Sequence, residues 1–386
     1  MRITKIETFL VDCYRTNWVF VKVITDEGIV GVGEATLEGR ELTVAEAIGE
    51  LGRYLIGQDP FAIEKHSMRM QRDCYWRTGP ILSTAISGVE MALWDIKGKA
   101  LGVPVYELLG GLVNARIKVY ANGWFAGART AEEFAEKAAA TVALGFRALK
   151  WDPFGTAYLN LSTREMDAAL KKVAAVREAV GPSVDLLIEA HGRFDVMTAC
   201  RIGRELGPFR PYWYEEPIPP GSPQALAEVR RAVPVPIAAG ERCYSRFDCA
   251  ELLRNDAVDV IQPDVCHVGG LLEMKRVASM ADAFYVPVSP HSPNGPVCHA
   301  ATLHFAASCH GFLMLETMVT DVSWRGEVAS EYGRFVDGCF EPPSQPGLGV
   351  ELHEGAFSRF SYSPKDLRHY DGSLTNIRPP DARRWF

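Results

Sequence analysis

Three glutamates recur at equal intervals, each near the end of a short apolar run. Glu189 lies in VDLLIEA, Glu215 lies in YWYEE and Glu241 follows PIAAG, with 26 residues between successive members. An interval of that length fits one strand-plus-helix unit, so the three carboxylates would occupy equivalent places on consecutive strands. Converging carboxylates resist ionising together unless a cation offsets their charge. A single glutamate at such a place is more often a helix cap or a surface group, but three in register predict a site for Mg²⁺, with Mn²⁺ as the alternative.

The series continues on the next three apolar runs. Asp264 closes VDVIQPD, His291 follows FYVPVSP and Glu316 lies in FLMLE, at steps of 23, 27 and 25 residues. A carboxylate on one strand beside an imidazole on the next can fix the histidine tautomer and raise its basicity. We therefore expect Asp264 and His291 to form a general-base dyad, although a histidine in a Ser-Pro-His-Ser-Pro turn, taken alone, is more often structural.

A further group of polar residues precedes the glutamates. Lys150 and Asp152 lie two residues apart in RALKWD, and alternate residues of a strand share a face. His191 follows Glu189 by the same step. We expect Lys150, Asp152 and His191 to border the same site as His291, from another side.

The apolar runs that carry these residues alternate with amphipathic stretches. Eight strand candidates follow residue 111, and the stretches between them include TAEEFAEKAAATVAL, REMDAALKKVAAVREAV and GGLLEMKRVASMADA; the strand candidates are IKVYANG, RALKWD, VDLLIEA, YWYEE, PIAAG, VDVIQPD, FYVPVSP and FLMLET. Repeated strand–helix units are typical of a modified (β/α)7–8 barrel of the TIM type, in which the carboxyl ends of the strands form the active face.

The first part of the chain has a different pattern. Three strand-like runs, beginning with ITKIETFLVDC, precede a helical region from 43 to 110. This order predicts an α+β capping domain over 1–113, followed by the barrel over 114–340. We expect the segment 341–386 to pack back onto the capping domain and complete it.

Composition narrows the range of partners. The 386 residues carry a net charge of −7 without a basic block, which argues against nucleic acid and anionic membranes as partners. No apolar run approaches the length of a membrane span. The nine cysteines lack disulfide or zinc spacing, so we expect free thiols and a cytoplasmic location.

The sequence resembles the mandelate racemase branch of the enolase superfamily across nearly its whole length. The resemblance rests on EMALWDIKGKALGVPVYELLGG, VYANGWF, LKWDPFG, LIEAHGRF, YEEP, AAGER, IQPDVCHVGG, SPHSPNGP and LETM. Within the branch, YANGWF, KxDPFG and ExHGRF are most similar to acid-sugar dehydratases of the gluconate/galactonate type.

This resemblance implies a role for each matching position. The metal ligands would be Glu189, Glu215 and Glu241, the base dyad Asp264 and His291, the general acid His191, and the groups at the substrate carboxylate Lys150 and Glu316. Asp152 departs from the family pattern, because racemases and cycloisomerases usually carry a second, basic lysine there. Racemisation needs a base on each face, so the departure disfavours a two-base racemase; Asp152 would bind substrate hydroxyls or pair with Lys150.

The implied reaction is dehydration of a sugar acid to a 2-keto-3-deoxy acid. His291 would remove the proton on carbon 2, and the 3-hydroxyl would leave as water, protonated by His191 or, in a syn elimination, by His291 itself. An aldonate such as gluconate or galactonate is the expected substrate, with an aldarate as the alternative. A cycloisomerase or epimerase on the same scaffold, and a barrel that binds without catalysis, are the competing interpretations.

Residues that read the sugar should lie on loops over the barrel mouth. The candidates are Asp152, Asn17, Trp18, Trp76, Arg77, Phe154, Arg193 and Trp324. Aromatic side chains in such positions more often serve packing, and Arg193 could equally form an ion pair. The family resemblance and the acidic composition also favour a homo-oligomer.

Overall fold

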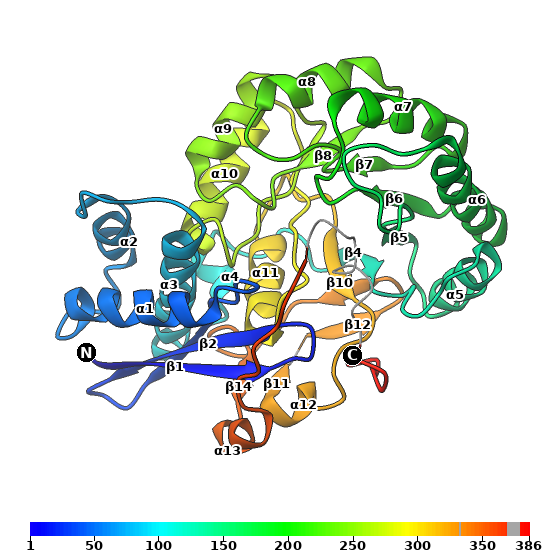
Figure 1. Cartoon of the computed structure of the whole chain (residues 1–386). Coiled ribbons are helices and arrows are strands. Elements are labelled where there is room, and N and C mark those ends of the chain that lie inside the picture. The colour runs from blue at the N-terminus through cyan, green and yellow to red at the C-terminus, as the bar shows by residue number, and fades with distance from the viewer. Residues whose placement is uncertain (332, 369–378) are drawn as a thin grey trace.

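The computed structural model describes residues 1–331, 333–368 and 379–386. It contains an antiparallel sheet with its helices at one side and a ring of parallel strands surrounded by helices at the other (Figure 1). The α/β barrel and capping domain expected from the sequence are both present. In the described part of the chain, no helix has the length and apolar character that crossing a membrane requires.

The capping domain is built on three strands in the order β1-β2-β3. Its elements are β1 (Ile3–Asp12), β2 (Asn17–Thr25), β3 (Val30–Glu34), α1 (Glu41–Leu55), α2 (Ile63–Arg72), α3 (Pro80–Leu101) and α4 (Val105–Leu108). Strand β3 packs closely on α3, and a Cβ atom at Gly33 would lie 1.9 Å from the carbonyl oxygen of Gly88. Glycine therefore permits the contact that brings β3 against the long helix.

The barrel contains parallel strands, each followed by a helix. Its strands are β4 (Ile117–Asn122), β5 (Ala148–Trp151), β6 (Asp185–Glu189), β7 (Trp213–Glu215), β8 (Ile237–Ala239), β9 (Val260–Ile261) and β10 (Leu315–Met318), and β10 pairs with β4 to close the ring. Its helices are α5 (Ala131–Ala143), α6 (Thr163–Val180), α7 (Val196–Leu206), α8 (Pro223–Ala232), α9 (Arg246–Arg254), α10 (Leu271–Ala283) and α11 (Pro296–Ala307). Helices α5 to α10 form an arc around the strands in Figure 1.

Seven of the eight expected barrel strands occupy their predicted places, but the seventh in chain order, FYVPVSP, does not form a strand. Between β9 and β10 the ladder consists of two single bridges, Ile261 to Val288 and Val288 to Phe312. Pro287 and Pro290 flank Val288 and have no N–H to donate, which limits pairing to one residue.

The remaining elements follow the barrel. They are α12 (Arg325–Val328), β11 (Ala329–Glu331), β12 (Arg334–Val336), β13 (Cys339–Glu341), β14 (Val350–Leu352) and α13 (Glu354–Phe357). The end of the chain contacts the first domain: Ser361 bridges Val11, and Ser363 exchanges two hydrogen bonds of 2.9 Å with the Asn17 side chain. Residues 369–378 of the predicted C-terminal segment lie outside the described part, and the three domain boundaries stay predictions.

The barrel interior explains why the polar residues converge. A closed layer of side chains fills the ring and is made by Tyr120, Ala148, Leu187, Trp213, Ala238, Val260 and Met314. Because alternate residues of a strand share a face, Lys150, Glu189 and Glu215, each two positions beyond a member of this layer, also point inward. This buried hydrophobic layer lies directly beneath the polar site.

Candidate active site at the carboxyl ends of the barrel strands

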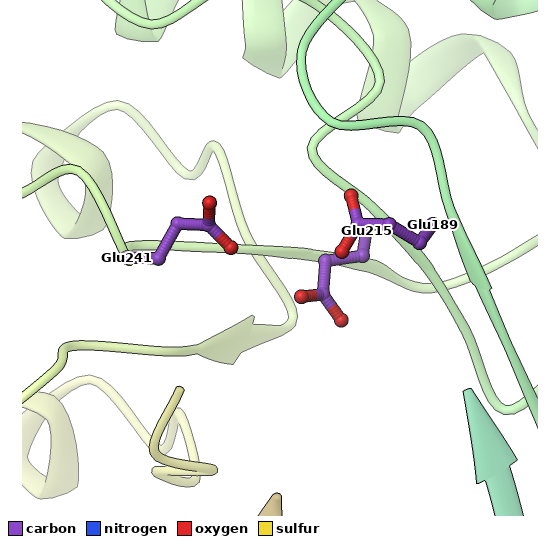
Figure 2. Close-up of side chains that lie close together, drawn as sticks. All are labelled: Glu189, Glu215 and Glu241. Atoms are coloured by element: carbon purple, nitrogen blue, oxygen red, sulfur yellow. The ribbon is translucent and has the colours of Figure 1, made fainter. Parts of the chain in front are cut away.

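The three equally spaced glutamates meet at the mouth of the barrel. One carboxylate oxygen from each of Glu189, Glu215 and Glu241 lies within 4.8 Å of the others (Figure 2). Glu189 and Glu215 end β6 and β7, and Glu241 lies two residues beyond β8. The buried Oε2 atom of Glu189 has no hydrogen-bond partner among the described residues. Three carboxylate oxygens at this spacing suit a hard divalent cation.

Burial and mutual repulsion shape the electrostatics of this triad. Burial, reinforced by the neighbouring Glu189 charge, raises the pKa of Glu215 well above its usual range. Burial also raises the pKa of Glu189. Glu241 differs: burial opposes its ionisation, but His291 and Arg242 outweigh that effect and lower its pKa to about 2. Such a cluster is stabilised by positive charge at its centre.

Lys150 supplies part of that positive charge from β5. Its Nζ atom lies 2.6 Å from Glu215 Oε1, 3.0 Å from Glu316 Oε1 and 3.4 Å from Glu189 Oε2. Although burial opposes its charge, these carboxylates raise the pKa of Lys150 well above the ordinary value. Lys150 therefore stays protonated and links the triad to Glu316.

Glu316 on β10 is held by donors from two sides. Asn122 Nδ2 donates to Oε1 at 2.7 Å, and the Ser292 backbone N–H donates to Oε2 at 2.9 Å. Burial opposes its ionisation, but Lys150 and His291 outweigh that effect and lower the pKa of Glu316. The Glu316 carboxylate is therefore ionised and held in place by its hydrogen bonds.

The structure brings Asp264 and His291 into direct contact. His291 Nδ1 lies 2.7 Å from Asp264 Oδ2, and its Nε2 lies 3.5 Å from Glu241 Oε2. The Asn294 side chain and the Cys266 N–H also donate to Asp264, at 2.9 and 2.7 Å. Burial lowers the pKa of His291, but the charge of Glu241 and the hydrogen bond that His291 donates to Asp264 outweigh it and raise the pKa to about 10. Nδ1 is thus fixed, and Nε2 is the atom left to exchange a proton.

A second imidazole–carboxylate pair lies across β5 and β6. His191 Nδ1 is 2.9 Å from Asp152 Oδ2, and Arg193 donates to the same oxygen at 2.5 Å. Burial opposes ionisation of Asp152, but these two partners outweigh it and lower its pKa. His191 takes a left-handed backbone conformation, with φ of 51°. Asp152 thus contacts His191 and Arg193, whereas Lys150, its other predicted partner, contacts three glutamates.

These groups line one cavity of about 280 Å³. Of the predicted residues, Lys150, Asp152, Glu189, His191, Glu241, His291 and Glu316 line it. Glu215 and Asp264 are fully buried; Glu215 accepts a hydrogen bond from Lys150, and Asp264 contacts His291.

The other candidates for substrate contact lie elsewhere and do not appear among the described residues that line the cavity. The Asn17 side chain bonds Ser363, and Trp18 is buried beneath Gly295. Phe154 and Arg193 are buried, Arg77 lines a neighbouring cavity, Trp76 is 80% exposed and Trp324 donates to the Asp12 carbonyl. These assignments to substrate binding stay predictions without support from the geometry.

The cavity has further lining residues; of these, the sequence pointed only to Arg242, which follows the strand of Glu241 and was expected to bind substrate or to pair with a glutamate. Arg15, Leu37 and Glu38 come from the capping domain; Asn122, Phe125, Trp151, Arg242, Tyr244, His267, Pro293, Asn294 and Met318 come from the barrel. Asn122 ends β4, so the rule that selected the glutamates could have found it. Arg15 and Glu38 follow no strand of the barrel, and only the packing of the two domains brings them to the site.

Family comparisons agree with this geometry. Residues 7–110 match the model for the mandelate racemase/muconate lactonizing enzyme N-terminal domain, and residues 133–356 match the enolase C-terminal domain-like model. D-galactonate dehydratases from Pectobacterium atrosepticum and Xanthomonas campestris pv. campestris are each 40% identical; the matches cover 96% and 97% of this chain and 97% and 99% of theirs.

Solved structures show the same similarity. An enolase superfamily member from Salmonella Typhimurium is 32% identical with a TM-score of 0.88, covering 93% of this chain and 98% of its own. A mandelate racemase/muconate lactonizing enzyme from Jannaschia sp. CCS1 is 33% identical with a TM-score of 0.89, covering 95% and 99%. With both domain models matched and the acidic triad assembled, this chain belongs to the mandelate racemase/muconate lactonizing enzyme branch of the enolase superfamily.

Proposed function

We propose that this protein is a hydro-lyase that dehydrates a sugar acid to a 2-keto-3-deoxy acid, with Mg²⁺ as its cofactor. The observation that carries the proposal is the placement of two carboxylate-bound imidazoles, His191 and His291, in one cavity with the acidic triad. The similarity to D-galactonate dehydratases over nearly the whole chain supports the same reaction class.

The chain's own groups divide the reaction between them. A divalent cation held by Glu189, Glu215 and Glu241 would polarise the substrate carboxylate and stabilise the charge that develops as the carbon 2 proton leaves. Lys150 and Glu316 line the cavity beside the triad, where Lys150 would bind that carboxylate and Glu316 would hold Lys150 in place. His291 Nε2 takes the proton, because Asp264 occupies Nδ1.

Loss of water then needs a proton at the 3-hydroxyl. His191 supplies it, and Asp152 holds the imidazole by Nδ1 so that Nε2 is the atom that donates. The carbon 3–oxygen bond breaks, water departs and the resulting enol tautomerises to the keto acid. Asp152 itself is engaged by His191 and Arg193, which leaves this position without the base that a two-base racemase needs.

The capping-domain side of the cavity favours an aldonate over an aldarate. Arg15 and Glu38 of the capping domain line it and form an ion pair with each other. The pair offers donors and acceptors to neutral hydroxyls, whereas a second carboxylate would meet an arginine already neutralised by Glu38. Galactonate and gluconate fit this description.

A substrate panel tests the proposal. Purified protein with Mg²⁺ is incubated with aldonates and aldarates, and keto acids are detected with semicarbazide. We expect keto acid from at least one aldonate. Formation of a lactone or an epimer without keto acid would favour the cycloisomerase or epimerase, and no turnover together with indifference to Mg²⁺ would favour a binding barrel.

We further propose that the protein is a homo-oligomer. Tyr75 and Trp76 pack edge to face on the connection between α2 and α3, yet are 89% and 80% exposed. Exposed aromatic pairs of this kind are characteristic of interfaces. Light scattering on the protein and on its Tyr75→Ser/Trp76→Ser variant tests this, with a smaller mass expected for the variant. The cytoplasmic location stays a prediction.

A further inference from the structure

Two carboxylates of the capping domain are fully buried although neither belongs to the cavity. Glu34 ends β3 and Glu90 lies in α3, and both are 0% exposed. Among the described residues, neither forms an ion pair with lysine or arginine. Burial raises the pKa of each to about 7, so an ionised carboxylate is disfavoured there unless other donors stabilise it.

Each carboxylate accepts one hydrogen bond within the capping domain, Glu34 from Thr36 and Glu90 from Trp94, and the others from backbone N–H groups of the barrel at the first turn of a helix. Glu34 accepts hydrogen bonds from the backbone N–H groups of Gly295, Val297 and Cys298, at 2.7, 3.1 and 2.9 Å. These groups begin α11. The N-cap of α11 is Gly295, which has no side chain to satisfy the free N–H groups. Glu34 thus provides from another domain the cap that α11 lacks.

Glu90 does the same for α10. It accepts from the N–H groups of Leu271 and Leu272 at 2.8 and 2.9 Å, and the N-cap of this helix is Gly270. Ser87, one turn earlier on α3, accepts from the Gly269 N–H at 2.9 Å. One face of α3 therefore fixes the start of α10.

The two capped helices are the ones that follow the dyad. Asp264 lies on the segment that leads from β9 into α10, and His291 lies five residues before α11 begins. The His291 segment also contacts Asp264 through Asn294. Each dyad member thus sits on a short segment with a barrel strand at one end and a helix start fixed by a capping-domain carboxylate at the other.

We propose that Glu34 and Glu90 are positioning residues for the base dyad, and that docking of the capping domain sets the alignment of His291 with Asp264. The inference rests on the proposed function. It predicts that loss of either carboxylate impairs proton abstraction at carbon 2 while the metal site, formed by β6, β7 and β8, keeps its affinity. Groups that orient a reacting residue typically contribute roughly 10- to 100-fold.

The experiment compares the holoenzyme with Glu34→Gln and Glu90→Gln variants. We expect kcat to fall roughly 10- to 100-fold, with KM and the Mg²⁺ concentration for half activation within about twofold of the parent, by analogy with groups that act only on the transition state. The primary isotope effect on kcat/KM with substrate deuterated at carbon 2 should increase, because proton abstraction becomes slower relative to the other steps. A variant that is merely less folded loses active molecules without changing this isotope effect.

Asp95→Asn is the control for loss of a buried carboxylate in the capping domain. Asp95 lies in α3 like Glu90, is 0% exposed and accepts backbone hydrogen bonds from Val32 and Leu348 rather than from a dyad segment; unlike the two glutamates, it also pairs with Lys99. We expect a lower Tm with unchanged kcat and isotope effect. If a glutamine variant does not fold, Glu34→Asp, which keeps the charge one methylene shorter, is measured for the same increase in isotope effect.

The outcomes separate the two proposals. An inactive parent enzyme on every sugar acid overturns the proposed function. An active parent whose folded Glu34 and Glu90 variants keep its kcat, or lose kcat with an unchanged isotope effect, overturns the positioning role alone.

Discussion

The Nδ1 atom of His191 lies 2.9 Å from Oδ2 of Asp152, the same contact that joins His291 to Asp264 at 2.7 Å. Each imidazole in the cavity is therefore fixed by a buried carboxylate that leaves Nε2 as the working nitrogen. The two pairs differ in their surroundings. His291 faces the carboxylates of Glu241 and Glu316, whereas the carboxylate of Asp152 is shared with Arg193.

Asp152→Asn tests the second pair. The amide keeps the size of the side chain but removes the charge that orients His191, so dehydration should slow roughly 10- to 100-fold. A 3-deoxy-3-fluoro aldonate should be much less affected, because fluoride leaves without full protonation. Rates of fluoride release and of keto acid formation are compared in parent and variant. Equal losses of rate on both substrates would show that Asp152 supports the whole site and not only the general acid, His191.

His291→Asn tests the base. The asparagine cannot accept the carbon 2 proton, and we expect a loss of at least roughly 100-fold in kcat, in the range that general-base groups contribute. The metal ligands lie on other strands, so Mg²⁺ should still raise the Tm of the variant. Keto acid assays and thermal melts measure the two properties. Substantial remaining activity in the variant would show that His291 is not the general base.

Much of this site could be predicted because barrel strands place their ends together. The 26-residue interval located Glu189, Glu215 and Glu241, and the same reasoning located Asp264, His291 and Glu316. The contact between Asp152 and Arg193 was not predictable in this way. Strand alternation predicts which residues share a face, but it does not predict where a long arginine side chain ends. The loss of the seventh expected strand also follows from local chemistry, since prolines flank Val288.

Contacts between the two domains could not be predicted from the sequence. Glu34 and Gly295, whose backbone N–H donates to it, are 261 residues apart, and neither residue type signals the other. The aromatic candidates for substrate contact, such as Trp18 and Trp324, were chosen by residue type and lie in packing positions. Arg15 and Glu38 reach the cavity only because β3 and the β1–β2 connection dock over the barrel.

The pKa of His291 predicts a link between metal and pH. A protonated imidazole cannot act as a base, so kcat/KM should rise with pH through the pKa of His291. Without a cation, Glu241 and Asp264 outweigh burial and raise that pKa to about 10. A cation that takes up the Glu241 charge removes one raising influence, so the acid limb should move to lower pH as Mg²⁺ increases. Rate profiles at several Mg²⁺ concentrations measure this, and a limb that does not move with Mg²⁺ contradicts it.

Removal of the metal should destabilise the fold around the triad. Glu189, Glu215 and Glu241 are drawn together, and Lys150, Arg242 and a protonated His291 offset only part of their charge, so a bound cation stabilises the native state over the unfolded one. At a Mg²⁺ concentration of about 100 times Kd, the added free energy of unfolding is about 2.7 kcal/mol. Thermal melts with Mg²⁺ and with EDTA measure the difference. In Glu189→Gln the difference should shrink, and equal melts for the parent under both conditions would exclude a resident cation.

Glu38→Gln tests how the cavity distinguishes substrates with one carboxylate from substrates with two. In the parent, Glu38 neutralises Arg15 on the capping-domain side of the cavity, and the variant frees the guanidinium for a second carboxylate. A charge-assisted hydrogen bond is worth about 1.5–3 kcal/mol, so the aldarate-to-aldonate ratio of kcat/KM should rise roughly 10-fold or more. Galactarate and galactonate form the test pair. Glu354→Gln, which removes the carboxylate paired with Lys22 on the outside of the capping sheet, serves as control and should leave the ratio unchanged. If Glu38→Gln also leaves it unchanged, the Arg15–Glu38 pair does not select the substrate.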